Sequence, residues 1–321
     1  MALNLILPAM SNRKLRLGTR GSLLARTQAG LISGQLQALT PYEVTEKIIQ
    51  TEGDDLTTVL TKLARPGIFV TALRGALLRG EVDFLVHSYK DLPSLPASGI
   101  TIAAVPERED YRDVLVSRDG LGLMKLRPRA RVGTSSPRRA ARIQHLRPDL
   151  IVLPIRGNID TRLRKISEGE FDAGVLAAAG LNRVQKSTEI TEYLTIEQLL
   201  PAPAQGALAI ECRSDDTELV EALAKLDHLP TRLITTAERA ILIGISATCA
   251  TAIGAFAQLQ QGTLTLTAEL SDGETDQHER FTSSTVNVDP MDTGKAHALG
   301  ITVAELIKDT PLGKRLSSTY E

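Results

Sequence analysis

The amino-acid sequence predicts an α/β protein with two lobes and a smaller α+β C-terminal domain. Short runs of hydrophobic and β-branched residues alternate with helical patterns up to about residue 200, which is the element order of an α/β layer structure. A charged junction at 107–113 and a proline-rich junction at 201–206 interrupt this alternation. The chain has 321 residues, more than one typical domain, so two or three hydrophobic cores are expected.

The elements follow from hydrophobic periodicity and from turn residues. Before the charged junction, we expect strands at Leu15–Gly18, Val44–Gln50, Phe84–Val86 and Ile100–Val105 and helices at Leu23–Leu39 and Ile68–Arg79. After it, we expect strands at Val114–Ser117, Arg131–Gly133, Ile151–Ile155 and Ala173–Leu176 and helices at Pro137–Leu146 and Ile159–Glu168. The rest predicts a strand at Ala207–Glu211, a helix ending near Gly244, strands at Ala255–Leu259 and Thr263–Leu270, and a closing helix near Gly294–Lys308. No sequence repeat is apparent.

Composition narrows the class of protein. A net charge of -1, 3% aromatic residues and no tryptophan argue against nucleic-acid binding. The two cysteines, Cys212 and Cys249, form no disulfide framework and no zinc-site spacing, so we expect a reducing cytoplasm and no metal. The apolar residues 2–10 precede their positive charges, unlike an export signal, and the uncharged segment 240–268 contains many polar residues. We therefore expect a protein without a membrane span.

Arginines stand at the start of a predicted helix, which is electrostatically unfavourable. Ser136 followed by Pro137 indicates an N-cap and a first helical residue, so Arg138 and Arg139 lie at the positive end of the helix dipole. An anion at this helix end would make the arrangement favourable, because free backbone N–H groups and guanidinium groups would both bind it.

The same pattern recurs at other predicted helix starts. Arg20 precedes a predicted N-cap at Ser22, and Arg156 and Arg162 flank another predicted helix start. For a single arginine, an exposed helix charge is the simpler interpretation, which we favour for Arg142, Arg147 and Arg164. As a set after strand ends, the arginines indicate an anionic ligand. Because no glycine-rich phosphate loop is present, carboxylates are the better candidate.

Acid/base groups cluster after the predicted strand at 84–86. His87, Ser88, Lys90 and Asp91 precede Pro93, where an α/β sheet usually carries its site. A capped turn explains Asp91 about as well as a catalytic role does. His87 is expected to hold the loop in place.

The motifs in combination resemble the porphobilinogen deaminase family, also called hydroxymethylbilane synthases. The resemblance covers nearly the whole chain after the N-terminal extension. It depends on Thr19–Ser22, Val86–Pro93, Glu107–Asp110, Val132–Arg139, Leu153–Asn158, Ala178–Leu181, Gln205 and Gly206–Arg213. It implies two periplasmic-binding-protein-like lobes, at 11–106 with 207–224 and at 112–200, and a C-terminal domain at 229–321.

The resemblance also implies an activity. Four molecules of porphobilinogen are deaminated and joined head to tail into hydroxymethylbilane, with release of ammonia, on a dipyrromethane cofactor held by a thioether. The small-molecule substrate carries acetate and propionate groups, which agrees with an arginine-lined site. The family further implies a cytoplasmic monomer of tetrapyrrole biosynthesis.

Site residues are implied by their positions in these motifs. Asp91 corresponds to the catalytic carboxylate, and Cys249 to the cofactor-bearing cysteine, while Cys212 is expected to be structural. The implied cofactor-binding residues are Arg20, Ser22, Lys90, Ser136, Arg138, Arg139, Arg156, Arg162 and Arg183. The implied substrate-binding residues are Arg20, Gln28, Lys62, Phe69, Arg156, Arg162 and Arg183.

Two segments depart from the family pattern, and two other functions stay open. The cysteine lies in Ala247–Gly254, without the usual glycine-rich lead and the following Pro-Ile-Gly. In Lys62–Phe69, Ala-Arg-Pro stands where the family has Gly-Gly-Lys, so Pro66 replaces a lysine in a loop that we expect at the mouth of the cleft. A two-lobed polycarboxylate-binding protein without catalysis is the main alternative. A nucleic-acid-binding protein is a weaker one.

Overall fold

The computed structural model describes residues 13–49, 68–248, 251–272 and 277–318. The chain divides into two compact units. The first unit is formed by Met1–His87, Ala97–Ala104 and Ile210–Asp227, and the second by Ser88–Pro96, Val105–Ala209 and His228–Glu321. In the part of the chain that is described, no helix combines the length and apolar character needed to cross a membrane.

A five-stranded sheet with the order β2-β1-β3-β10-β4 organises the first lobe. Its strands are β1 (Lys14–Thr19), β2 (Glu43–Ile48), β3 (Phe84–Ser88), β4 (Ile100–Ala104) and β10 (Leu208–Arg213), and its helices are α1 (Leu23–Leu39), α2 (Ile68–Leu78) and α6 (Thr217–Ala224). Strand β1 is parallel to β2 and β3, whereas β10 is antiparallel to β4. Helix α1 begins after Ser22, whose hydroxyl group accepts a hydrogen bond from the backbone N–H of Ala25.

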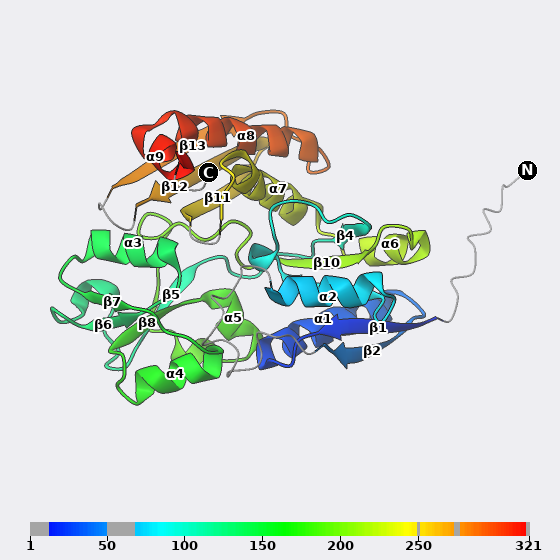
Figure 1. The fold of residues 1–321 in the computed structure, drawn as a ribbon, viewed down its shortest axis with the longest axis horizontal. Coiled ribbons are helices and arrows are strands. Elements are labelled where there is room, and N and C mark those ends of the chain that lie inside the picture. The colour runs from blue at the N-terminus through cyan, green and yellow to red at the C-terminus, as the bar shows by residue number, and fades with distance from the viewer. Residues whose placement is uncertain (1–12, 50–67, 249–250, 273–276, 319–321) are drawn as a thin grey trace, which may run out of the picture. The chain divides into compact units, whose positions relative to one another are not determined.

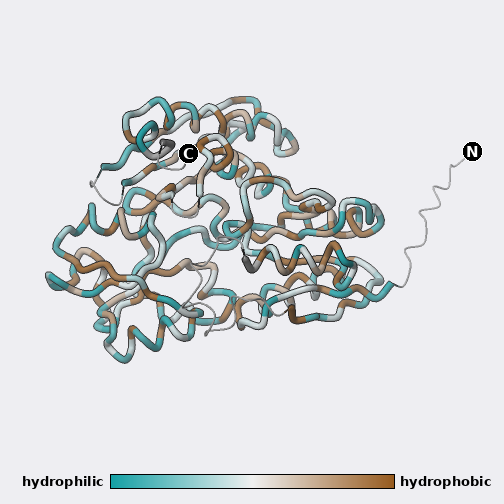
Figure 2. The backbone as a smooth tube through the Cα atoms, viewed as in Figure 1, coloured by the Kyte–Doolittle hydropathy of each residue, from teal (hydrophilic) through white to brown (hydrophobic). Residues whose placement is uncertain are grey.

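The second lobe has a five-stranded sheet with the order β7-β6-β8-β5-β9. Its strands are β5 (Asp113–Ser117), β6 (Arg131–Gly133), β7 (Ile151–Leu153), β8 (Ala173–Ala177) and β9 (Glu192–Tyr193), and its helices are α3 (Pro137–Leu146), α4 (Ile159–Ser167) and α5 (Ala178–Arg183). Helices α3 and α4 cover opposite faces of the sheet (Figure 1). Hydrophobic residues follow the strands between the two helices (Figure 2), so both faces of the sheet are buried.

The two sheets have the same strand order. Strands β2, β1, β3, β10 and β4 of the first sheet occupy the same places as β7, β6, β8, β5 and β9 of the second. In each sheet one strand, β10 or β5, stands out of chain order between its neighbours. A buried aspartate directly precedes the middle strand of each sheet, β3 or β8. Asp83 accepts from the backbone N–H of Arg16 (2.8 Å) and Asp172 from that of Arg131 (2.7 Å). The lobes therefore repeat a structure that their sequences do not reveal.

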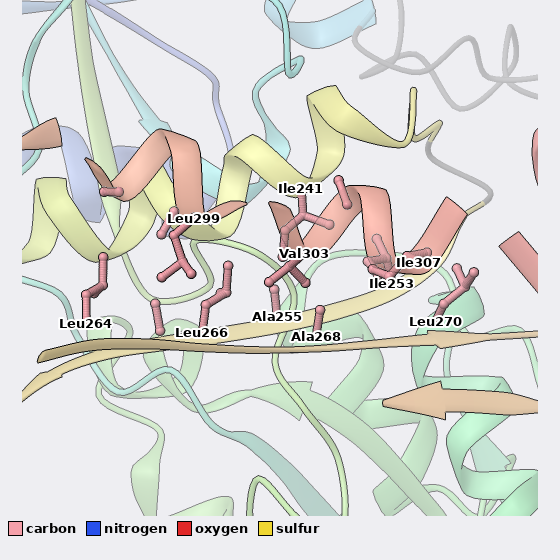
Figure 3. Close-up of a cluster of buried hydrophobic side chains, with 14 of the residues drawn as sticks. Ile241, Ile253, Ala255, Leu264, Leu266, Ala268, Leu270, Leu299, Val303 and Ile307 are labelled. Atoms are coloured by element: carbon pink, nitrogen blue, oxygen red, sulfur yellow. The ribbon is translucent and has the colours of Figure 1, made fainter. Parts of the chain in front are cut away.

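The C-terminal part of the second unit packs helices on an antiparallel sheet. Strands β11 (Ala252–Gln260), β12 (Thr263–Ser271) and β13 (His278–Thr285) are covered by α7 (Leu229–Gly244) and α8 (Thr293–Asp309), and α9 (Pro311–Ser318) follows. Leu299, Val303 and Ile307 of α8 point toward the apolar face of the sheet (Figure 3). A side chain at Gly300 would collide with the backbone of Ala237, so glycine permits the close contact of α7 with α8.

The predicted fold class, α/β with a small α+β domain, is confirmed. Most predicted elements are present, and the predicted bounds of α1 and α3 coincide with the observed ones. Strand β7 ends before Pro154, which lacks an N–H donor, instead of reaching Ile155. The prediction omitted β9, β13, α5, α6 and α9, which are short or, in β13, mostly polar.

Candidate active site

The start of α3 has the predicted geometry. The hydroxyl group of Ser136 accepts from the backbone N–H of Arg139 (3.4 Å), and Pro137 occupies the first helical position. Both Arg138 and Arg139 are buried, which is unusual for arginine. They need anionic partners, because burying a cation without one is costly.

The anionic partner that the described residues supply is Asp113, the first residue of β5. Its carboxylate accepts from Arg138 Nη1 (2.7 Å) and from Arg139 Nε (2.9 Å) and Nη2 (2.6 Å). Burial raises the pKa of Asp113, but the two guanidinium groups outweigh it and hold this pKa well below its usual range. The protein itself thus provides one anionic partner, the Asp113 carboxylate, at this helix start.

Gln205 connects this cluster to Lys90. The Gln205 amide nitrogen donates to Asp113 Oδ1 (3.0 Å) and to the Tyr111 carbonyl (2.8 Å), and its amide oxygen accepts from Lys90 Nζ (3.0 Å). Burial, together with the charge of Arg139, lowers the pKa of Lys90 to about 8. Lys90 is therefore a cation that can titrate near neutral pH.

Asp91 is the last residue of a short 3₁₀ helix, Tyr89–Asp91, and is exposed. Arg239 of α7 fixes this turn by donating to the carbonyl oxygens of Tyr89 (3.0 Å) and Leu92 (3.2 Å), and its guanidinium lies 4.5 Å from the Tyr89 ring centroid. The Asp91 carboxylate is thus accessible on a rigidly held turn.

Further arginines of the second unit have donors left for a ligand. Burial, assisted by Arg139, lowers the pKa of Arg162, and the charge of Asp91 opposes this shift. Arg162 Nε donates to the Gly157 carbonyl (2.9 Å), and Arg183 Nη2 donates to the Gly206 carbonyl (2.7 Å). Burial lowers the pKa of Arg183 to about 10.

Several buried guanidinium nitrogens, Nη1 of Arg142 among them, have no acceptor among the described residues. Among the described residues, the Nε atoms of Arg138 and Arg183 have no hydrogen-bond partner, although each is shielded from solvent. Arg156, on the loop before α4, is exposed. Unsatisfied buried donors are costly, and an anionic ligand would satisfy the Nε donors of Arg138 and Arg183.

The remaining candidates lie in the first unit or outside the described residues. Arg20 is half-buried between β1 and α1, Ser22 caps α1, and Gln28 is buried on α1. Phe69 belongs to the first turn of α2. Lys62, the segment expected at the cleft mouth up to residue 67, and Cys249 lie outside the described residues.

The structure contradicts the interpretation of two arginines as solvated helix charges. Arg142 is buried and donates to the carbonyl oxygens of Gln198 (2.8 Å) and Glu197 (2.9 Å). Arg147 does pair with Asp149 (2.7 Å), but its side chain is only 12% exposed and also donates to two carbonyl oxygens of the segment before β6. Sequence spacing could not reveal these distant carbonyl groups. Arg164 is exposed and pairs with Glu168 (2.6 Å), as expected.

Sequence reasoning missed Asp113 as a part of the site and treated Gln205 only as a motif residue. The available signal was the position of Asp113 at a strand start after a charged junction. Its partners Arg138 and Arg139 lie 25 and 26 residues away, and Gln205 lies 92 residues away. Such pairings emerge only from the sheet topology.

Cys212 and His87 have structural surroundings in the first unit. Cys212 is fully buried on β10, and burial raises the pKa of its thiol to about 12, so it is a poor nucleophile. His87 Nε2 lies 3.3 Å from Glu211, which is also paired with Arg74 (2.6 Å). These contacts agree with the expected role of His87 in fixing the strand end.

The fold and the site define a two-lobed α/β protein with an exposed carboxylate, Asp91, and with arginines whose buried Nε atoms have no partner among the described residues. Comparison with known families gives the class. Residues 15–221 match "Porphobilinogen deaminase, dipyromethane cofactor binding domain", and residues 233–309 match "Porphobilinogen deaminase, C-terminal domain". The chain belongs to the porphobilinogen deaminase family.

Individual relatives carry the same name. The porphobilinogen deaminase of Thermobifida fusca is 51% identical over 250 residues, which cover 78% of this chain and 78% of that protein. That of Cutibacterium acnes is 44% identical over 317 residues, covering 92% of this chain and 94% of that protein. A solved structure, the periplasmic VFT2 domain of Bordetella pertussis BvgS, has a TM-score of 0.39 at 16% identity and covers 66% of this chain and 86% of that domain. This last similarity is too low to support an argument.

Proposed function

We propose that the chain is a transferase, a hydroxymethylbilane synthase, which deaminates porphobilinogen and joins four molecules head to tail. The observation that carries the proposal is the pair of buried guanidinium donors without a described partner, Nε of Arg138 and of Arg183, in the unit that also contains the exposed Asp91. The family match supports the same activity. We further propose that it acts as a cytoplasmic monomer.

The residues of the site fit a dipyrromethane cofactor. Its carboxylates match the buried Nε donors of Arg138 and Arg183, and Arg156, Arg162 and Lys90 supply further cations. When bound, the cofactor provides the primer to which pyrrole units are added. Cys249 is proposed as its covalent anchor, with Arg20, Ser22, Ser136 and Arg139 as additional contacts. The hydroxyl groups of Ser22 and Ser136 also cap helices.

Asp91 is proposed to carry the chemistry. The substrate becomes more positive as ammonia leaves its aminomethyl group, and a carboxylate stabilises this charge and can take up the proton that is later lost. The hydrogen bonds from Arg239 hold the turn, so the position of Asp91 is fixed before the substrate binds. Arg156, Arg162 and Arg183, with Arg20, Gln28, Lys62 and Phe69, are proposed to bind the acidic substrate.

The proposed function is tested by supplying porphobilinogen to the purified chain and measuring ammonia release and intact mass. We expect turnover and a mass above that of the sequence by two pyrrole units. Cys249→Ser should lack this increment, whereas Cys212→Ser should keep it, because Cys212 is buried and weakly acidic. Ligand binding without ammonia release would identify the non-catalytic binding protein instead.

The pKa of Lys90 predicts a pH dependence. Burial lowers this pKa to about 8, so the ammonium group is charged below that pH and loses its charge as the pH rises through it. If Lys90 binds carboxylates, kcat/KM should fall above about pH 8. In Lys90→Arg the charge persists, so the fall should move to higher pH. An unchanged alkaline limb in this variant would contradict the role of Lys90.

A further inference from the structure

Asp113 stands at the centre of the charged cluster in the second unit. It is the first residue of β5, where it pairs with Ala177 of β8, and it is fully buried. Its carboxylate accepts hydrogen bonds from Arg138, Arg139 and Gln205 at 2.6–3.0 Å. No ligand can approach a group that is enclosed in this way, so Asp113 acts through its neighbours.

The bonds to Asp113 determine which donors remain for a ligand. Arg139 uses Nε and Nη2 on Asp113 and Nη1 on the Val175 carbonyl (3.0 Å), so its guanidinium is held almost entirely by the protein. Arg138 uses Nη1 on Asp113 and on the Leu200 carbonyl, whereas its buried Nε has no acceptor among the described residues. Through these bonds, the donors of Arg139 are used by the protein, whereas Arg138 keeps one donor, Nε, for a ligand.

Gln205 connects Asp113 to Lys90, the residue beside Asp91. Because its amide nitrogen donates to Asp113 and to the Tyr111 carbonyl, its amide oxygen must face Lys90. Gly206 follows with φ of 89°, and a side chain there would overlap the backbone of Glu109, so the loop has little freedom to turn the amide.

We propose that Asp113 is a positioning residue of the active site, which orients Arg138 directly and Lys90 through Gln205 toward the carboxylates of the bound pyrroles. This inference rests on the proposed function. Asp113 touches neither cofactor nor substrate. Its effect is to fix the direction of two cations, which matters because a guanidinium group recognises a carboxylate only in a narrow geometry.

The chain offers a matched control in Asp172. This carboxylate is also buried in the second lobe and also paired with arginines, Arg127 (2.9 Å) among them. It precedes β8, whereas Asp113 pairs with the last residue of that strand, so the two lie at opposite ends of β8. Asp172→Asn therefore reproduces the loss of a buried charge without touching the proposed site.

The experiment compares Asp113→Asn and Asp172→Asn in the full-length chain. We expect both variants to lose stability, but only Asp113→Asn to show a smaller fraction of molecules with the cofactor mass and a KM raised by about tenfold or more. In this variant, kcat/KM should also start to fall at a lower pH than in the wild type. The charge of Asp113 raises the pKa of Lys90, so its removal lowers that pKa. The same cofactor loading, KM and pH profile in both variants would overturn the proposal.

A second variant covers the case in which Asp113→Asn does not fold. Gln205→Leu keeps the Asp113 charge and its pairs with both arginines but removes the link to Lys90. We expect a raised KM and an alkaline limb at altered pH, and wild-type values for both would refute the link. If the wild-type chain releases no ammonia from porphobilinogen, the proposed function itself fails, and the positioning role fails with it.

Discussion

Asp91→Asn is expected to lower kcat by about 10²–10⁴-fold, the usual contribution of a positioned acid or base. An amide has nearly the shape of the carboxylate but cannot stabilise a developing cation or accept a proton as a carboxylate does. Asp91 is exposed and makes no described bond that holds the turn, whereas Arg239 does, so the fold should persist. Steady-state kinetics on chains with equal cofactor mass would measure the effect.

The control for this prediction is a surface acidic residue with no proposed role in the chemistry. Asp119 is a surface carboxylate of the second lobe paired with Arg118 (3.1 Å), and Asp119→Asn should leave kcat nearly unchanged. Turnover of Asp91→Asn within a few-fold of the wild type would exclude Asp91 as the group that handles charge.

Arg108→Ala is expected to cause the largest loss of stability, about 3–5 kcal/mol, because it leaves a buried carboxylate without its cation. Glu238 of α7 is fully buried and accepts from Arg108 Nη1 (2.7 Å) and Nη2 (3.1 Å). The same carboxylate accepts from the backbone N–H groups of Ala204 (2.7 Å) and Ala257 (2.9 Å). One ion pair therefore links α7, β11 and the loop that carries Gln205.

Thermal unfolding followed by circular dichroism would measure this loss. At roughly 2–4 °C per kcal/mol for a domain of this size, Tm should fall by about 10 °C. Arg164→Ala removes an exposed Arg–Glu pair and should shift Tm by no more than about 2 °C. Similar small shifts in both variants would show that the buried pair contributes little.

Local signals in the sequence predicted much of the fold. The caps at Ser22 and Ser136 placed the starts of α1 and α3 because a capping hydroxyl group and the helix that follows are adjacent in the chain. Strand β13 was missed because it pairs along its full length with β12 while presenting mostly polar side chains. Its stability comes from a partner strand, which local propensity does not report.

The candidate site was predictable in composition but not in arrangement. The helix starts indicated a set of arginines facing an anion, and motif resemblance selected Asp91. The division between Arg139, which the protein satisfies, and Arg138, which keeps a free donor, depends on Asp113 across the sheet. Arg142 and Arg147 were misjudged for the same reason, since their acceptors are carbonyl groups of distant segments. The roles of Cys249 and Lys62 stay predictions.

The position of β10 in the first sheet has a consequence for biosynthesis. All five strands of the second sheet come from the continuous segment 113–193, whereas β10, which lies between β3 and β4, begins at residue 208. A chain leaves the ribosome from its N-terminus, so the second sheet has all its strands before the first sheet does. Of the two lobes, the one that is translated first is therefore completed last, and until β10 is made β3 lacks its neighbour on one side and β4 lacks its pairing partner.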